Sequence, residues 1–178
     1  MGGMSLTNIA KLSSFKFFMQ LVGAVFAISL LTAQVVSSNE TEELQLTITG
    51  NIKSEKGAIY FSPGDMAAST PTDIVTSSPW TSGKTVFRGV LLRDILKSVD
   101  AQGTVLKASA VDGYTVEIPI SDAEDFDMII AYRLNGVALE KDVYGPFWII
   151  YPYDSDDKLG QEKYHARSIW QLTKLVVE

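Results

Sequence analysis

Short apolar runs separated by tight-turn signals restrict this chain to a fold that is rich in antiparallel strands. Residues 105–111 and 114–120 are strand-like runs on either side of Asp112-Gly113, a dipeptide that tolerates the positive φ angles of a type I′ turn. Asn135-Gly136 follows the apolar run 128–134 in the same way. The sequence therefore predicts two β-hairpins in the second half of the chain.

The remaining sequence predicts more strands and only short helices. Ser62, Pro63 and Asp65 combine a capping-box spacing with proline at the first helical position, and Ser121 with Glu124 repeats the capping-box spacing. Helices are therefore expected over 62–68, over 90–98 and from residue 121, and strands over 43–52, 58–61, 72–76, 84–89, 147–151 and 169–177. Many strands with few helices give the α+β class, with mixed β-sheets rather than a doubly wound sheet.

Residues 1–38 have the pattern of a secretory signal peptide. Two lysines precede an apolar run over 17–31, and small residues follow, with Ala33 or Ser38 as cleavage positions. The run of 15 residues is shorter than the ~20 that a membrane-spanning helix needs, which favours a cleaved leader over an uncleaved anchor. We therefore expect residues 39–178 to form a single domain in the periplasm, with no part inserted in the membrane.

Composition removes several classes of site. The sequence contains no cysteine and one histidine, so a disulfide, a cysteine-ligated metal, a cysteine nucleophile and a two-histidine metal site are excluded. Acidic residues outnumber Lys and Arg by 21 to 15, and this negative charge disfavours nucleic acid as a partner. His165 has no nucleophile that can be named beside it, and the acidic loop 154–160 fails the EF-hand pattern at Lys158 and Leu159. The sequence thus predicts neither a catalytic centre nor a metal site.

Several aromatic side chains fall in loops or at strand ends, where ligand pockets form. Trp80 lies in a Ser/Gly loop, Tyr114 follows a tight turn, and Tyr151 ends an expected strand that also contains Trp148. Such rings beside carboxylates are able to hold a flat polar heterocycle. The competing interpretation places Trp148 and Trp170 in the core, because aromatic residues carry large buried area. We adopt it for Trp170, and for Trp80 both interpretations stay open.

An ordered series of motifs resembles the sulfite-oxidase-type molybdopterin-binding domain over about residues 43–178. The motifs are Phe87-x-Gly89-Val90-x-Leu92-x-Asp94-Ile95-Leu96, Ala110-x-Asp112-Gly113-Tyr114, Ile118-Pro119, Asn135-Gly136-x-x-Leu139, Gly145-Pro146, Pro152 and Arg167-Ser168-Ile169-Trp170. The resemblance implies that family's fold and, for its catalytic members, molybdenum anchored through a cysteine thiolate.

Three departures separate this chain from those catalytic members. The cysteine is absent, Trp148 stands where they have an arginine after the proline, and Ile169 stands where they have a lysine before the late tryptophan. Molybdopterin carries a phosphate, which calls for Arg, Lys or a helix N-terminus. The segments 78–80, 147–152 and 167–170 look instead like the small periplasmic pterin-binding proteins that share this fold without molybdenum.

This narrower resemblance implies a binding protein for a reduced, unphosphorylated pterin, with no enzymatic activity and no catalytic cofactor. It also implies that the protein reports to a membrane-bound cyclic-di-GMP enzyme, a diguanylate cyclase or phosphodiesterase, through that enzyme's periplasmic domain. Two alternatives stay open. One is a molybdopterin-dependent oxidoreductase with a non-cysteine metal ligand, and the other is a ligand-free interaction protein whose former pocket is filled by core side chains.

Pterin chemistry assigns roles to these aromatic and charged residues. A pterin stacks on Trp or Tyr rings, its 2-amino and N3–H edge donates two parallel hydrogen bonds to a carboxylate, and its carbonyl and N5 accept hydrogen bonds. The expected site therefore has Trp80 and Trp148 as stacking walls, Asp112 or Asp154 as the carboxylate, and Tyr114, Tyr151 and Arg167 as polar contacts.

Overall fold

The computed structural model describes residues 45–178, all of which lie in one compact unit, Glu42–Glu178. Within them the strands are β1 (Leu46–Gly50), β2 (Ala58–Phe61), β3 (Thr72–Thr76), β4 (Thr85–Leu91), β5 (Val105–Ala110), β6 (Thr115–Pro119), β7 (Ile129–Leu134), β8 (Val137–Ala138), β9 (Trp148–Ile150) and β10 (Leu172–Val177). The helices are α2 (Pro63–Ala68), α3 (Leu92–Ser98), α4 (Ile120–Asp125) and α5 (Glu162–Arg167), with the 3₁₀ turns η1 (Tyr153–Ser155) and η2 (Asp157–Gly160). The expected leader over residues 1–38 lies outside the described residues. Among residues 45–178, no helix combines the length and the apolar character needed to cross a bilayer.

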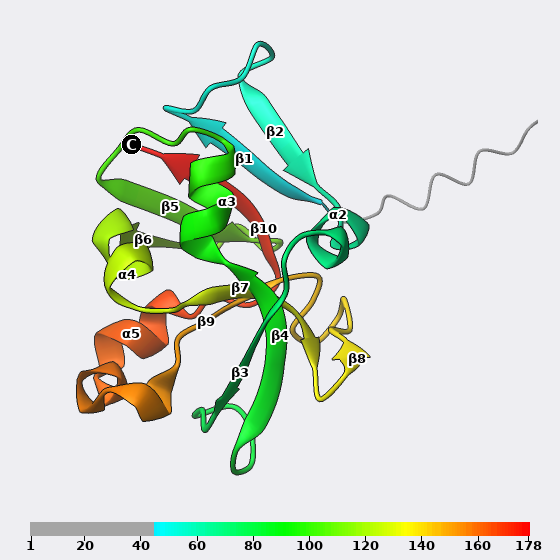
Figure 1. Cartoon of the computed structure of the whole chain (residues 1–178), viewed down its shortest axis with the longest axis vertical. Helices are drawn as coiled ribbons and strands as arrows, with labels where there is room; N and C mark the ends of the chain where they lie inside the picture. The colour runs from blue at the N-terminus through cyan, green and yellow to red at the C-terminus, as the bar shows by residue number, and fades with distance from the viewer. Residues whose placement is uncertain (1–44) are drawn as a thin grey trace, which may run out of the picture. The chain divides into compact units, whose positions relative to one another are not determined.

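Two sheets carry the fold (Figure 1). The first has the strand order β2-β1-β10-β5-β6, in which β1 and β10 are parallel and the other neighbours are antiparallel. The second has the order β3-β4-β7-β8, and β9 also pairs with β7. Mixed sheets with few short helices confirm the α+β prediction.

The second sheet contains a close backbone approach that only glycine permits. The register between β4 and β7 shifts between Arg88 and Gly89. A Cβ added at Gly89 would lie 2.2 Å from the carbonyl oxygen of Ile130. Because no side chain fits there, Gly89 lets β4 continue along β7 and turn into α3.

The short strand β9 is buried on both faces and links the two sheets. All three of its residues are buried. The backbone N–H of Ile149 donates to the carbonyl oxygen of Ile169 (3.0 Å), and that of Leu172 donates to Phe147 (2.9 Å). The segment that leads into β10 therefore runs beside β9, so β9 is covered by chain that is distant in the sequence.

The two glycine turns differ from each other. β7 and β8 pair antiparallel, which confirms the hairpin predicted at Asn135-Gly136, and these two residues have the positive φ angles of a type I′ turn, 49° and 83°. At the β5–β6 hairpin, only Gly113 has a positive φ, 88°, so the type I′ prediction for Asp112-Gly113 is wrong. The N–H of Ala110 donates to the carbonyl of Tyr114, which leaves three loop residues instead of two. A three-residue loop ending in a left-handed glycine needs only that one positive φ.

The helix starts also show one success and two failures of the capping signals. The N–H of Asp65 donates to Ser62 Oγ (3.1 Å) and the N–H of Ser62 donates to the Asp65 carboxylate (2.8 Å), which confirms the first capping box. The second is wrong, because α4 begins before Ser121 and has no side-chain cap. α5 is missed by the sequence patterns, since its N-cap, Gln161, makes no capping hydrogen bond.

Candidate ligand-binding site

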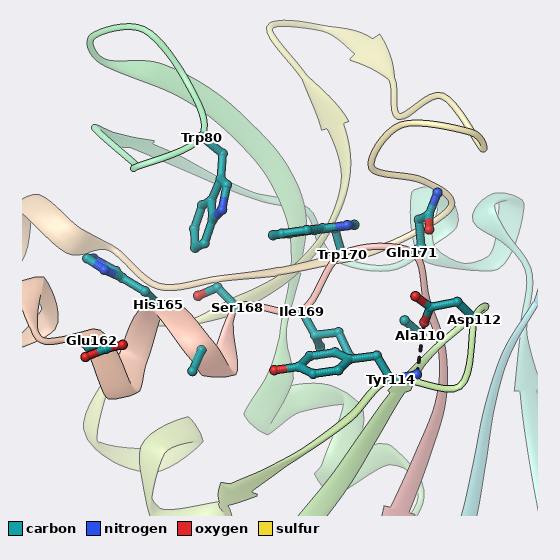
Figure 2. A pocket seen from close by; sticks show the side chains of 11 residues that line it. Trp80, Ala110, Asp112, Tyr114, Glu162, His165, Ser168, Ile169, Trp170 and Gln171 are labelled. Atoms are coloured by element: carbon teal, nitrogen blue, oxygen red, sulfur yellow. Dashed lines mark hydrogen bonds between the residues drawn. The ribbon is translucent and has the colours of Figure 1, made fainter.

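A cavity of about 440 Å³ opens between the loop before β4, the β5–β6 turn, α5 and the segment that leads into β10 (Figure 2). Its lining residues are Trp80, Ala110, Asp112, Tyr114, Glu162, His165, Ala166, Ser168, Ile169, Trp170 and Gln171. The volume lies within the range of about 300–1,000 Å³ that small-molecule sites occupy. Of the expected site residues, the cavity brings together Trp80, Asp112 and Tyr114.

Aromatic rings form the walls of this cavity. The ring of Trp80 lies 5.7 Å from that of Trp170 and 6.0 Å from that of His165, in both cases edge to face. Figure 2 shows the ring of Trp170 close to edge-on and the ring of Tyr114 on the other side of the cavity, seen obliquely. A flat heterocycle that enters between Tyr114 and Trp170 would therefore meet a ring on each face.

Trp170 is the lining residue that sequence reasoning misplaced. It was expected in the core, but its side chain is 38% exposed and lines the cavity. Its neighbour Ile169 is buried, as is Leu172. Gln171 between them has a positive φ of 49°, so the chain bends there and turns the indole outward.

Trp148 does not line the cavity, and the prediction that it forms a stacking wall is wrong. Its side chain is 0% exposed. Its ring stacks on that of Tyr144 at 4.3 Å, meets Phe87 edge-on at 5.6 Å, and its Nε1 donates to the carbonyl of Ser168 (3.1 Å). These partners cover Trp148 and leave no ring face for a ligand. Trp148 packs against Trp80, with 5.6 Å between the ring centroids.

Tyr151 and Arg167 also point away from the cavity, so their prediction as polar ligand contacts is wrong. Both donate to the same carboxylate oxygen of the buried Asp122, at 2.7 Å and 2.8 Å. Burial, followed by the bond to Asp122, raises the pKa of Tyr151 and keeps its phenol protonated. This network ties α5, which carries Arg167, to α4, which carries Asp122.

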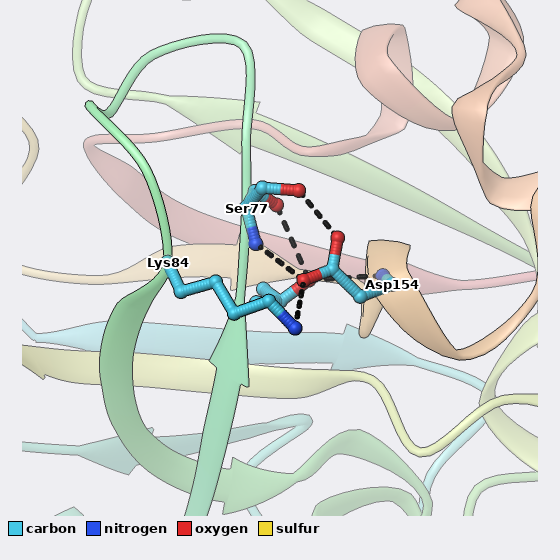
Figure 3. A network of polar contacts seen from close by, with 4 residues as sticks. Ser77, Lys84 and Asp154 are labelled. Atoms are coloured by element: carbon cyan, nitrogen blue, oxygen red, sulfur yellow. Dashed lines mark hydrogen bonds and ion pairs between the residues drawn. The ribbon is translucent and has the colours of Figure 1, made fainter.

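Asp154 holds the base of the Trp80 loop instead of contacting a ligand (Figure 3). Its carboxylate accepts hydrogen bonds from the backbone N–H of Ser77 (3.1 Å) and from the Ser77 hydroxyl, and it pairs with the Lys84 ammonium at 3.4 Å. The Ser77 bonds, more than Lys84, lower the pKa of this carboxyl. The prediction that Asp154 reads a pterin edge is therefore wrong, because its oxygens are engaged outside the cavity.

The charged groups at the cavity are acidic. Asp112 and Glu162 line it, and no Lys or Arg is among its lining residues. One Asp112 oxygen accepts from the backbone N–H of Tyr114 (2.9 Å), which fixes the carboxylate on the turn. Within residues 45–178, the side chain of Glu162 makes no hydrogen bond or ion pair.

Glu162 and His165 were missed as lining residues because α5 was missed. Positions 162, 165 and 166 share one face of a helix, and this spacing is the signal that identifies them once the helix is recognised.

The residues present do not fit a molybdenum-bearing molybdopterin. The chain has no cysteine to supply a thiolate. Among residues 45–178 there is no group of three His, Asp or Glu side chains placed to hold a metal ion. The phosphate of molybdopterin would enter a cavity that presents two carboxylates and no Lys or Arg.

Comparisons with known proteins agree with this architecture. No curated protein sequence matches the chain. Among solved structures, the chain is similar to the sulfane dehydrogenase SoxCD from Paracoccus pantotrophus, with a TM-score of 0.56 and 19% sequence identity. That match covers 75% of this chain and 37% of SoxCD, so the chain spans little more than a third of that protein, and the likeness shows the fold alone.

A family model assigns the chain directly. The model of the oxidoreductase molybdopterin binding domain matches residues 63–154, just over half of the chain and the part that runs from α2 to η1. The resemblance seen in the sequence motifs is thereby confirmed at the level of family and fold. The chain belongs to the oxidoreductase molybdopterin-binding domain family and has its sulfite-oxidase-type fold.

Proposed function

We propose that this protein binds a reduced pterin that carries neither molybdenum nor phosphate. The observation that carries the proposal is the cavity itself, with facing rings at Tyr114 and Trp170 and carboxylates at Asp112 and Glu162. Membership of a family built around a pterin cofactor supports the choice of ring system. The missing thiolate and the missing phosphate-binding cations explain why the bare organic ring, and not the complete cofactor, is the ligand.

The slot suits the chemistry of a pterin ring. Asp112 lies on the β5–β6 turn at one end of the cavity (Figure 2), so a flat bicycle between Tyr114 and Trp170 is able to turn its edge toward that carboxylate. The 2-amino group and N3–H of a pterin donate in parallel, and a carboxylate accepts both. Asp112 is therefore the residue that we assign to this edge, as one of the two carboxylates that the sequence left open.

The protein acts as a receptor without chemistry of its own. Asp112, Glu162 and His165 are the acidic or basic side chains at the cavity. Ser168, whose hydroxyl lines it along with the phenol of Tyr114, bonds to Tyr153 and to the carbonyl of Tyr164. This set supplies recognition but no free nucleophile with an adjacent base.

The biological context rests on the sequence. The signal-peptide pattern of residues 1–38 supports export to the periplasm. The resemblance to small periplasmic pterin-binding proteins supports a relay in which occupancy of the cavity is reported to the periplasmic domain of a membrane-bound diguanylate cyclase or phosphodiesterase. No direct membrane contact is required for this role.

Titration of the exported protein, expressed as the full chain and purified, with tetrahydrobiopterin by calorimetry tests the proposal. Binding at micromolar concentrations, with no stoichiometric molybdenum or tungsten by elemental analysis, is the expected result. Absence of heat and of a thermal shift at high micromolar ligand would reject it. Stoichiometric metal would instead favour an oxidoreductase with a non-cysteine ligand.

The ligand-free alternative makes a different prediction for the same measurements. It requires a filled pocket, and an open cavity of about 440 Å³ disfavours it, although Trp148 is packed as that alternative expects. If no small molecule co-purifies with the protein and no pterin binds to it, the results would favour the ligand-free alternative.

A further inference from the structure

The two carboxylates of the cavity lie at its opposite ends. In Figure 2, Asp112 stands beside Gln171 at one end and Glu162 stands beside His165 at the other, with Tyr114, Trp170 and Trp80 between them. Asp112 lies on the same turn as Tyr114, whose backbone N–H donates to it at 2.9 Å, whereas Glu162 lies on α5. A ring between Tyr114 and Trp170 therefore uses one end of the cavity and leaves the other end to its substituent.

Resting on the proposed function, the geometry points to a separate subsite for the pterin side chain, formed by Glu162, His165 and Trp80. Glu162 accepts hydrogen bonds from hydroxyl groups on the 6-substituent, and the subsite excludes a phosphate at that position. The ligands of this protein are thus hydroxylated, unphosphorylated 6-substituted pterins. Glu162 is the residue that sets this specificity.

The hydrogen-bonding capacity of Glu162 supports this assignment. Within residues 45–178, its carboxylate has no hydrogen-bonding partner and lies at the first position of α5, where it is exposed. An ionised carboxylate offers only acceptor sites, so the groups it favours are donors such as hydroxyls. His165, three residues on and on the same face, provides a ring nitrogen that is able to donate to a second hydroxyl.

The charge of the cavity supports the exclusion of phosphate. Neither Asp112 nor Glu162 shares the cavity with Lys or Arg, and Arg167, the nearest arginine in sequence, is occupied by Asp122. A phosphate at the Glu162 end would meet a carboxylate of like charge, with no Lys or Arg among the lining residues to offset the repulsion. His165 alone is the possible counter-charge there.

Four probes separate the contribution of the ring from that of its substituent. Tetrahydrobiopterin carries two side-chain hydroxyls, 6-methyltetrahydropterin carries none, and the pair 7,8-dihydroneopterin and its 3′-phosphate differ only in the phosphate. Calorimetric titrations are run on the unmodified protein, expressed as the full chain and purified after export, and on Glu162→Gln, Asp112→Asn and Glu124→Gln. Glu124 is an exposed carboxylate on α4 that does not line this cavity, so it serves as the matched control.

Glu162→Gln should weaken the binding of tetrahydrobiopterin by about tenfold or more, because a charged hydrogen-bond acceptor is lost. The affinity for 6-methyltetrahydropterin should be unchanged. The same variant should reduce the ratio of the affinity for 7,8-dihydroneopterin to the affinity for its 3′-phosphate. Asp112→Asn should weaken the binding of all four probes by a similar factor, because Asp112 contacts the ring edge that the probes share. Glu124→Gln should change none.

The outcomes distinguish the two proposals. If no probe binds the unmodified protein, the proposed function fails and this inference fails with it. If the probes bind but Glu162→Gln affects the hydroxylated and methylated pterins equally, or neither, the subsite is overturned while the pterin receptor stands. Thermal unfolding of each variant confirms that it folds, which is expected for Glu162 because no partner among residues 45–178 depends on it.

Discussion

The carboxylate of Asp154 accepts hydrogen bonds from both the backbone N–H and the hydroxyl of Ser77, although Asp154 and Ser77 are 77 positions apart in the sequence. Lys84 adds an ion pair to the same carboxylate at 3.4 Å. Ser77 and Lys84 flank the loop that carries Trp80 (Figure 3), so one side chain on η1 fixes both ends of that loop. The position of a cavity wall thus depends on a residue that does not line the cavity.

Asp154→Asn is therefore expected to weaken pterin binding severalfold without removing any ligand contact. The amide retains one acceptor for Ser77 but loses the charge that holds Lys84, and the Trp80 loop gains freedom that binding must then restrict. Calorimetry measures the affinity, and indole fluorescence reports the environment of Trp80.

The matched control for this variant is Asp73→Asn. Asp73 lies on β3, the strand that leads to the same loop, and accepts two hydrogen bonds from the Arg88 guanidinium, at 2.6 Å and 2.7 Å. It should leave both affinity and fluorescence unchanged. Equal effects of the two variants would mean that the loop does not depend on Asp154.

The contribution of Asp154 to stability should decrease in acid, because the pKa of its carboxyl is lowered in the folded protein. Because the folded-state pKa lies below the usual value of 3.8, the bonds to Ser77 and Lys84 stabilise the fold above about pH 4 and are lost as pH falls through the folded-state pKa. Melting temperatures of the unmodified protein should exceed those of Asp154→Asn by a constant margin at neutral pH. That margin should shrink below about pH 4, and parallel curves down to pH 2 would contradict it.

Substitution of the half-buried Trp80 or the exposed Trp170 should reduce the affinity for the pterin. Trp80→Ala and Trp170→Ala each remove a ring that lines the cavity. Loss of one stacking partner is worth about 0.5–1.5 kcal/mol beyond area burial, which is about a two- to twelvefold rise in Kd. Calorimetry with tetrahydrobiopterin checks the affinity, and unchanged thermal unfolding of Trp170→Ala shows that the loss is local.

Trp148→Phe provides the contrasting case, because this indole is fully buried against Tyr144 and Phe87. The smaller ring leaves a void and the Ser168 carbonyl without its donor, so unfolding should become easier by about 2 kcal/mol or more. Denaturant titration measures this change. A Trp148 variant that loses affinity at full stability would restore it as a ligand wall.

The positions of these indoles show where sequence reasoning succeeds and where it stops. Turn dipeptides and alternating apolar residues locate the strands, because these signals act within a few residues. Trp148 and Trp170 both fall in segments where the sequence predicts a strand, and their local patterns are alike. What distinguishes them is the contact between Ile149 and Ile169, which covers β9 on one side and leaves Trp170 at the edge of the cavity.

The charged residues of the expected site show the same limit. Asp112, Asp154 and Arg167 were equally plausible as ligand contacts from their residue types. Only the fold shows that Arg167 is neutralised by Asp122 and that Asp154 holds a loop, since both partners are distant in sequence. Glu162 and His165 escaped notice because α5 has only six residues and no capping side chain, so its helical spacing was hidden.

The buried ion pair between α4 and α5 leads to the last prediction. Arg167 and Asp122 are 21% and 9% exposed at their side chains, and Tyr151 donates to the same oxygen. Arg167→Ala leaves a buried carboxylate without its cation, so the free energy of unfolding should fall by about 3 kcal/mol, the lower end of the range for broken buried pairs. Arg88→Ala is the control, because its pair with Asp73 is exposed and should contribute at most about 1 kcal/mol.

Denaturant unfolding of the two arginine variants separates these cases. Because α5 also carries Glu162 and His165, Arg167→Ala should weaken pterin binding as well, although Arg167 does not line the cavity. Tyr151→Phe should give a smaller loss of stability, about 1–2 kcal/mol, since it removes one of the two donors to Asp122. If Arg167→Ala costs no more than Arg88→Ala, then α5 is held by packing alone, and the cavity wall that it forms does not depend on the Asp122 network.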